Sequence, residues 1–202
     1  LADGFDSDSL YWDAGDGDSR LEVQPWRLTK RYDYRGGSPL RLYRKIPDGE
    51  GSMRKIPVLS IPLPAEGIPV TVLLRARPGE EPPLAARVLE DDFENFPRNT
   101  MRVVNLCERH VAGKFEEDFE SLEPGEVIAM PIESPRNVFI FKMLLPREEG
   151  EYSTAVSRFR IKESMRVMVI CRPGVLNPSE TPLMVELFRE TDFPVLTVDE
   201  AQ

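Results

Sequence analysis

Apolar and polar residues alternate along most of the chain after residue 20, with a period of two rather than the helical period of 3.6. The series of predicted strands includes residues 58–63, 70–76 and 84–89. Clusters of glycine, proline and acidic residues separate these runs at intervals of roughly 8–12 residues. Short strands with turn chemistry between them predict an all-β protein built as an antiparallel β-sandwich.

A charged stretch over residues 90–99 interrupts the strand series and is the best candidate for a domain boundary. We therefore predict two small sandwiches in tandem, with an acidic N-terminal arm over 1–20, a first β domain over 21–92 and a second over 100–199. One large domain is the alternative. The strands predicted in the second half cover residues 101–107, 111–115, 126–132, 138–145, 157–161, 166–171, 183–188 and 195–198, and only residues 116–122 have some helical leaning.

The first half also predicts a hairpin. Gly36-Gly37-Ser38-Pro39 is typical of a turn, with Tyr32 and Tyr34 on one arm and residues 40–46 on the other. Residues 21–25 alternate as a further strand. The first 20 residues carry six aspartates and little core material, which favours an extended arm or loop.

Composition strengthens the β prediction and narrows the partners. Nineteen prolines, many beside apolar runs, leave little room for long helices. The 26 Lys and Arg residues against 35 Asp and Glu residues give a net charge of −9, which repels phosphate backbones and makes nucleic acid an improbable partner. No apolar run is long enough, at about 18 residues, to predict a membrane span. No signal peptide is visible at the N-terminus.

The residue types that usually carry catalysis are scarce. His110 is the single histidine and lies three residues after Cys107, a spacing that places the two on opposite faces of a strand. A Cys/His nucleophilic pair or a zinc site is therefore not expected. Cys107 and Cys171 are either two separate buried thiols or, in an exported chain, a disulfide. We predict no catalytic, cofactor-binding or metal-binding residues.

Acidic and aromatic clusters suggest two weaker alternatives. Asp13, Asp16 and Asp18 superficially resemble a calcium loop but lack its spacing and flanking helices, and Glu90-Asp91-Asp92 is better explained as a loop that caps a sheet edge. The aromatic residues of the first quarter fit either strand packing, which we favour, or a sugar-stacking platform; they are Tyr11, Trp12, Trp26, Tyr32, Tyr34 and Tyr43.

Short motifs at several places give the chain a resemblance to a family of uncharacterised exported proteins. They include Tyr34-Arg35-Gly36-Gly37, Ile56-Pro57-Val58, Leu89-Glu90-Asp91-Asp92, Phe96-Pro97, Arg102-Val103-Val104-Asn105-Leu106 and Leu122-Glu123-Pro124-Gly125. The chain is similar over about residues 20–190 to such proteins from verrucomicrobial and planctomycete bacteria. The resemblance implies a precursor with a signal peptide and a periplasmic or extracellular setting. It implies no activity and no functional residues.

Two functions follow as hypotheses. The first is a non-enzymatic exported β-sandwich module with a binding or cell-envelope role, whose loops or open strand edges contact a protein or glycan partner. Prolines beside the strands limit which edges stay open. The second is a carbohydrate-active protein, either a sugar-binding module or a hydrolase with two carboxylates. An enzyme is the weaker expectation, and the sequence leaves the oligomeric state open.

Overall fold

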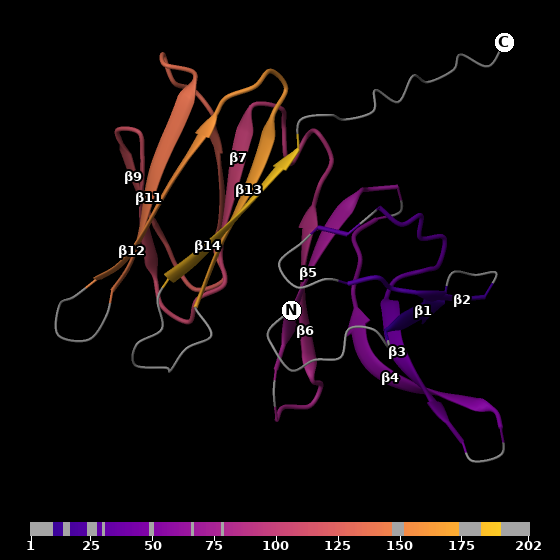
Figure 1. Cartoon of the computed structure of the whole chain (residues 1–202). Coiled ribbons are helices and arrows are strands. Elements are labelled where there is room, and N and C mark those ends of the chain that lie inside the picture. Colours follow the sequence, from indigo (N-terminus) through magenta and orange to yellow (C-terminus); the bar gives the residue numbers. More distant parts are fainter. Residues whose placement is uncertain are drawn as a thin grey trace, which may run out of the picture. The chain divides into compact units, whose positions relative to one another are not determined.

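The computed structural model describes residues 10–13, 17–23, 28–29, 31–48, 51–65, 67–77, 79–146, 152–173 and 183–190. These residues form strands and turns and contain no helix, so the fold is all-β as predicted (Figure 1). Accordingly, no helix that could span a bilayer occurs among them. The chain divides into two compact units between Asn95 and Phe96, and each unit is described by itself.

The first unit holds a four-stranded sheet and a two-stranded ribbon. The sheet has the order β2-β1-β3-β4, and β5 pairs with β6 in the ribbon. The bounds are β1 (Tyr11–Asp13), β2 (Asp18–Arg20), β3 (Leu40–Pro47), β4 (Met53–Ile61), β5 (Val70–Ala76) and β6 (Leu84–Glu90). All pairs in this unit are antiparallel.

One apolar cluster joins the sheet and the ribbon of the first unit. Leu10, Leu42, Ile61 and Leu84 are each at most 2% exposed within it. Trp12 also lies in this core, although its segment was expected to be an arm. The expectation fails there because Leu10 and Trp12 supply enough apolar surface to hold β1 against β3. Residues 1–9 lie outside the described residues.

The predicted hairpin around Gly36–Gly37 is wrong. Residues 31–37 form no strand, and β3 pairs instead with β4 and with β1. The Tyr34 hydroxyl donates to the carbonyl of Gly37 at 2.8 Å, so this segment closes on itself as a turn. No strand covers residues 21–23 either, and the expected strand over 195–198 lies outside the described residues.

The second unit is a sandwich of two four-stranded sheets, with the orders β10-β7-β13-β14 and β12-β11-β8-β9. Its pairs are antiparallel except for β7 and β13, which run parallel from Thr100 opposite Arg166 to Asn105 opposite Cys171. The strands are β7 (Thr100–Asn105), β8 (Val111–Phe115), β9 (Asp118–Leu122), β10 (Val127–Pro131), β11 (Val138–Pro146), β12 (Tyr152–Arg160), β13 (Arg166–Pro173) and β14 (Leu183–Glu190).

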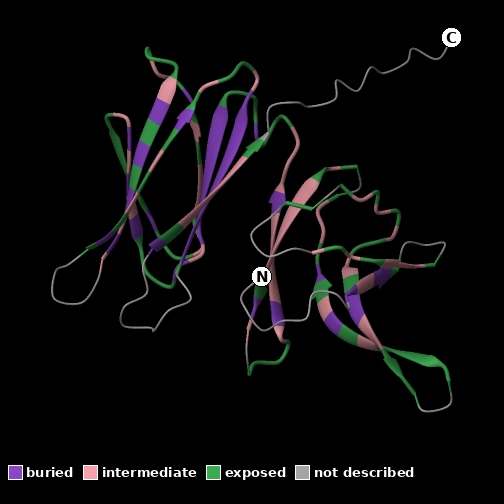
Figure 2. Ribbon diagram, in the orientation of Figure 1, coloured by how far each residue is buried: buried purple, intermediate pink, exposed green. Residues whose placement is uncertain are grey.

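The core of this sandwich takes residues from both sheets; burial alternates along β8 and β11, whereas β7 and β13 are buried along nearly their whole length (Figure 2). Phe115 stacks on Phe141 with ring centroids 6.0 Å apart, and Phe139 stacks on Phe159 at 5.5 Å. In β11 the burial alternates along the strand, as the sequence predicted. The weak helical leaning of residues 116–122 is overturned, since β9 occupies most of that segment.

Phe96 fixes the start of the second unit. Two guanidinium groups lie over its ring, with the Cζ of Arg102 at 4.2 Å and that of Arg166 at 4.7 Å from the ring centroid. Arg166 also donates from Nη1 to the Phe96 carbonyl at 3.1 Å. Cation–π contacts of this kind hold the segment before β7 against its own sheet.

Candidate functional site

The candidate nucleophile and base of the sequence do not meet. Cys107 is buried in the sandwich core, whereas His110 is exposed in the turn before β8. Cys107 and Cys171 are free thiols in the same core cluster. Burial, and to a lesser degree the neighbouring Cys107, raises the pKa of Cys171 to about 12. A thiol with that pKa is not a nucleophile at neutral pH.

Asp18 of the predicted acidic loop forms ion pairs rather than part of a cation site, and Asp16 lies outside the described residues. Asp18 accepts hydrogen bonds from Lys55 and Tyr43 and lies 3.0 Å from Lys45 Nζ. The hydrogen bonds from Lys55 and Tyr43 hold the pKa of Asp18 far below its usual range. Among the described residues no three His, Cys, Asp or Glu side chains gather into a metal-binding group.

Asp91 and Asp92 organise a loop, as the sequence favoured. Asp91 accepts from Thr71 Oγ1 at 3.1 Å. Asp92 accepts from the backbone of Glu94 at 2.8 Å and of Asn95 at 2.9 Å. The Asn95 side chain also donates to Asp92. This bond has the largest effect, and together with the backbone bonds it lowers the pKa of Asp92. Both carboxylates are therefore used in capping this end of the ribbon.

Most aromatic residues of the first quarter pack on the core instead of forming a platform. Trp12 is 5% exposed, and its ring centroid lies 5.8 Å from that of Tyr32 and 5.2 Å from that of Tyr34. Tyr43 is buried, with its hydroxyl bonded to Asp18. Tyr11, Tyr32 and Tyr34 are half-buried, and the ammonium of Lys45 lies over the ring of Tyr11. Trp26 lies outside the described residues.

A cleft of about 630 Å³ lies at one end of the second unit and is the best candidate for a binding site. Three connections line it: residues 98–100 at the start of β7, residues 131–133 with Asn137 between β10 and β11, and residues 161–163 between β12 and β13. Seven of its ten lining residues are exposed, so it is an open depression at the surface rather than an enclosed pocket.

Two asparagines shape the walls of this cleft. Asn99 has φ = +56° and Asn137 has φ = +53°, both in the left-handed region that asparagine tolerates better than most residues. The backbone of Asn99 donates to Met165 at 2.8 Å and accepts from Ile132 at 2.7 Å. One residue thus ties all three connections together, because Met165 follows the β12–β13 turn and Ile132 follows β10.

The same short motif precedes both walls. Pro97-Arg98-Asn99 comes directly before β7, and Pro135-Arg136-Asn137 comes directly before β11. The carbonyl of Asn137 accepts from Ile161 at 2.9 Å, which links the second motif to the third connection. The repeated Pro-Arg-Asn was the sequence signal for this site, and our prediction of no site residues did not use it.

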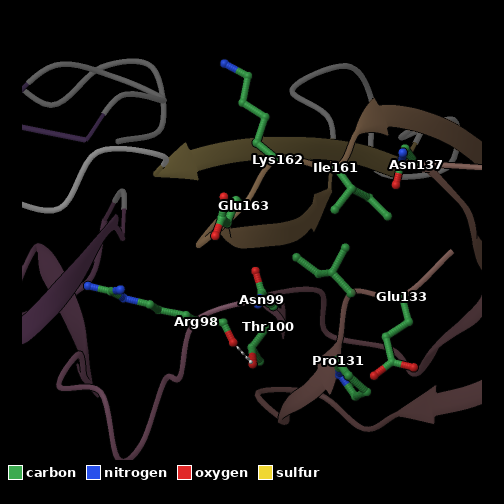
Figure 3. A pocket seen from close by; sticks show the side chains of 10 residues that line it. Arg98, Asn99, Thr100, Pro131, Glu133, Asn137, Ile161, Lys162 and Glu163 are labelled. Atoms are coloured by element: carbon green, nitrogen blue, oxygen red, sulfur yellow. Dashed lines mark hydrogen bonds between the residues drawn. The ribbon is translucent and has the colours of Figure 1, made fainter.

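The lining is polar and balanced in charge. Arg98 and Lys162 are its cations, and Glu133 and Glu163 are its anions. Figure 3 shows Ile161 pointing into the space between the connections, while the long side chains of Arg98 and Lys162 extend away from it. None of the ten lining residues is aromatic. The cleft therefore offers hydrogen bonds and an apolar wall, but no stacking surface for a sugar ring.

Comparisons with known proteins add no family. The chain matches no protein-family model and no curated protein sequence.

Proposed function

We propose that the chain is an exported binding module whose second unit holds a small polar ligand in the cleft. One observation carries this proposal: Asn99 and Asn137 hold a conformation that costs free energy at each wall of the same cleft. Strained backbone that neighbouring hydrogen bonds maintain is concentrated at functional sites. Export rests on the resemblance described above.

The lining defines the chemistry of the ligand. Arg98 and Lys162 extend away from the cleft, so the hydrogen-bonding and apolar groups of the lining, rather than its charges, define the ligand (Figure 3). Thr100, Asn99 and Asn137 provide hydroxyl and amide groups, and Ile161 provides an apolar wall. A short neutral oligosaccharide or peptide segment has the matching hydroxyl, amide and aliphatic groups.

A library screen followed by cleft variants tests the proposal. Binding of neutral oligosaccharides and uncharged tripeptides would be measured by calorimetry on the full chain. Asn137→Gly keeps the left-handed backbone and deletes the side-chain amide, so it should lower the affinity for a ligand bound in the cleft by about tenfold or more. Arg136→Ala is the matched control, since Arg136 is the exposed neighbour and does not line the cleft. Equal loss in both variants would contradict binding in the cleft.

Hydrolysis of a glycan is the second candidate, because Glu133 and Glu163 line one cleft and two carboxylates suffice for that chemistry. Turnover of an oligosaccharide by the wild type, lost in Glu133→Gln and in Glu163→Gln, would establish it. Binding that survives in both variants without any turnover would favour the non-enzymatic module.

A further inference from the structure

The edge strand β12 of the second unit is nine residues long. It is the outermost strand of its sheet and pairs with β11 over nine positions, from Tyr152 opposite Pro146 to Arg160 opposite Val138. The register shows no bulge. The outer side of such a strand presents backbone N–H and C=O groups that are not used within the sheet.

β12 lacks several of the usual protections of a sheet edge, although it carries two charged side chains, Arg158 and Arg160. Edge strands are commonly kept short or interrupted by proline or bulges. The edge strands β9 and β10 have five residues each, and β10 ends at Pro131. In contrast, β12 contains neither proline nor glycine. β14 of the other sheet lies beside β12, with the backbone N–H of Leu183 donating to Ser153 Oγ at 2.8 Å, but the two strands share no backbone ladder. The backbone edge of β12 can therefore pair with another strand.

The outward side chains of β12 define what kind of strand would pair. Tyr152 is 61% and Val156 is 65% exposed at one part of the strand. Arg158 and Arg160 are exposed at the other, and in the described part of the chain neither forms an ion pair. Lys142, opposite Val156 on β11, adds a third exposed cation to this face.

We propose that β12 receives an additional antiparallel strand from an acidic partner protein. The carboxylates of that strand would lie opposite Arg158 and Arg160, and its apolar side chains opposite Val156 and Tyr152. Opposite charges and apolar pairs across strands are both stabilising. Antiparallel pairing is favoured because it is the more stable arrangement per residue.

β12 differs from β14, the other long edge strand of this unit, in the charge of its exposed side chains. β14 carries Glu186, which already pairs with Arg172 at 2.8 Å, so its face does not attract carboxylates. The net charge of −9 makes most of the chain's surface repel an acidic strand. The exposed cations of β12 and Lys142 thus mark one place where such a strand can approach.

A designed peptide tests the pairing directly. Read antiparallel to β12, the complementary strand is Glu-Thr-Glu-Thr-Val-Thr-Thr-Thr-Tyr, acetylated and amidated at its ends and labelled for fluorescence anisotropy. We expect it to bind the full chain, more weakly as salt rises. N-methylation of alternate backbone amides, which removes the donors but keeps the side chains, should abolish binding. This arm needs no protein variant.

Charge reversal locates the contact. Arg158→Glu combined with Arg160→Glu should weaken the peptide at least about tenfold, because two attractive cross-strand pairs become repulsive. Arg41→Glu combined with Arg54→Glu makes the same charge change at two exposed positions of the first unit and should leave the affinity within about twofold.

Several results would overturn the proposal. They are absence of peptide binding, equal binding of the N-methylated peptide, equal loss in the two double variants, and preferred binding of phosphatidylglycerol vesicles over the peptide at equal charge. A dimer in analytical ultracentrifugation that the Arg158 and Arg160 changes dissociate would assign the edge to a second copy of the chain and would also overturn it.

Discussion

Asn105 ends β7 at the end of the sandwich opposite the cleft, and replacing it with aspartate is a sharp test of how that end is held. Its side chain is fully buried. The Nδ2 group lies 2.9 Å, 3.0 Å and 3.1 Å from the carbonyls of Arg109, Leu122 and Glu123. Its Oδ1 accepts from the backbone of Cys107 at 2.9 Å. Asn105→Asp keeps the shape and exchanges the donor group for an acceptor.

The magnitude follows from these contacts. The carboxylate retains the bond from Cys107 but directs an oxygen at three carbonyl oxygens. The Nδ2 group has two N–H donors for these three carbonyls, and losing them costs about 1 kcal/mol each. A buried carbonyl left without a donor costs about 1–3 kcal/mol more. We therefore expect Asn105→Asp to lower the free energy of unfolding of the second unit by about 3–5 kcal/mol at pH 7.

The loss must depend on pH. Burial among carbonyls raises the pKa of the new carboxyl in the folded state above its unfolded value of about 3.9. The folded state then binds more protons, so the variant's stability falls as pH rises from about 4 through the folded-state pKa. At lower pH the neutral acid donates one hydrogen bond and the deficit relative to wild type narrows.

Urea unfolding at pH 4.5 and 7.5 measures both effects. Both tryptophans, Trp12 and Trp26, belong to the first unit, so circular dichroism is needed to follow the second. Asn137→Asp is the matched control, since Asn137 is exposed and should change stability by less than about 0.5 kcal/mol. A deficit below about 1 kcal/mol, or one that is equal at the two pH values, would refute the reasoning.

Three further predictions concern the cores and the ion pairs. Gly113→Ala places its methyl group against the ring of Phe115, which is 2% exposed, so we expect a loss of about 1–3 kcal/mol in thermal unfolding, and wild-type stability would contradict this. Cys171, with its pKa raised to about 12 by burial, should resist iodoacetamide at pH 8 until urea unfolds the chain, as mass spectrometry would show. Asp18→Asn should destabilise the first unit at pH 7 in tryptophan-monitored unfolding. Because Lys55 and Tyr43 lower the pKa of Asp18 in the folded state, the difference in stability from wild type should shrink as pH falls below about 4. A difference that stays constant with pH would exclude that origin.

Alternation predicted the strands that bury one face and missed those that do not. β11 buries Phe139, Phe141, Met143 and Leu145 at alternate positions, and the sequence shows this directly. β9 buries only Leu122 and exposes the rest, so it carries no period-two signal and was read with a helical leaning. Polar edge strands are defined by their neighbours rather than by their own sequence.

Turn chemistry identified bends but not pairing. Gly36-Gly37-Ser38-Pro39 does form a bend, yet the partner of β3 on that side is β1, with Tyr43 opposite Tyr11. Local residues decide whether the chain turns, whereas the partner of a strand depends on apolar contacts between distant segments. Three connections meet at the cleft for the same reason, which is why single-segment patterns did not reveal it.

The two ends of the second unit differ in how their backbone groups are satisfied, and this difference argues for where binding occurs. At the Asn105 end one buried amide closes the connections on each other with ordinary geometry. At the cleft end the backbone of Asn99 and Asn137 links the connections by hydrogen bonds, and both residues are in a left-handed conformation. A glycine would adopt that conformation at a lower free energy than asparagine does. Asparagine at both positions therefore keeps a side-chain amide at the expense of backbone stability. If Asn99→Gly stabilises the chain and lowers the affinity for the ligand, as Asn137→Gly also should, the two amides serve binding. Unchanged affinity in both variants would mean that the asparagines serve only to form the turns.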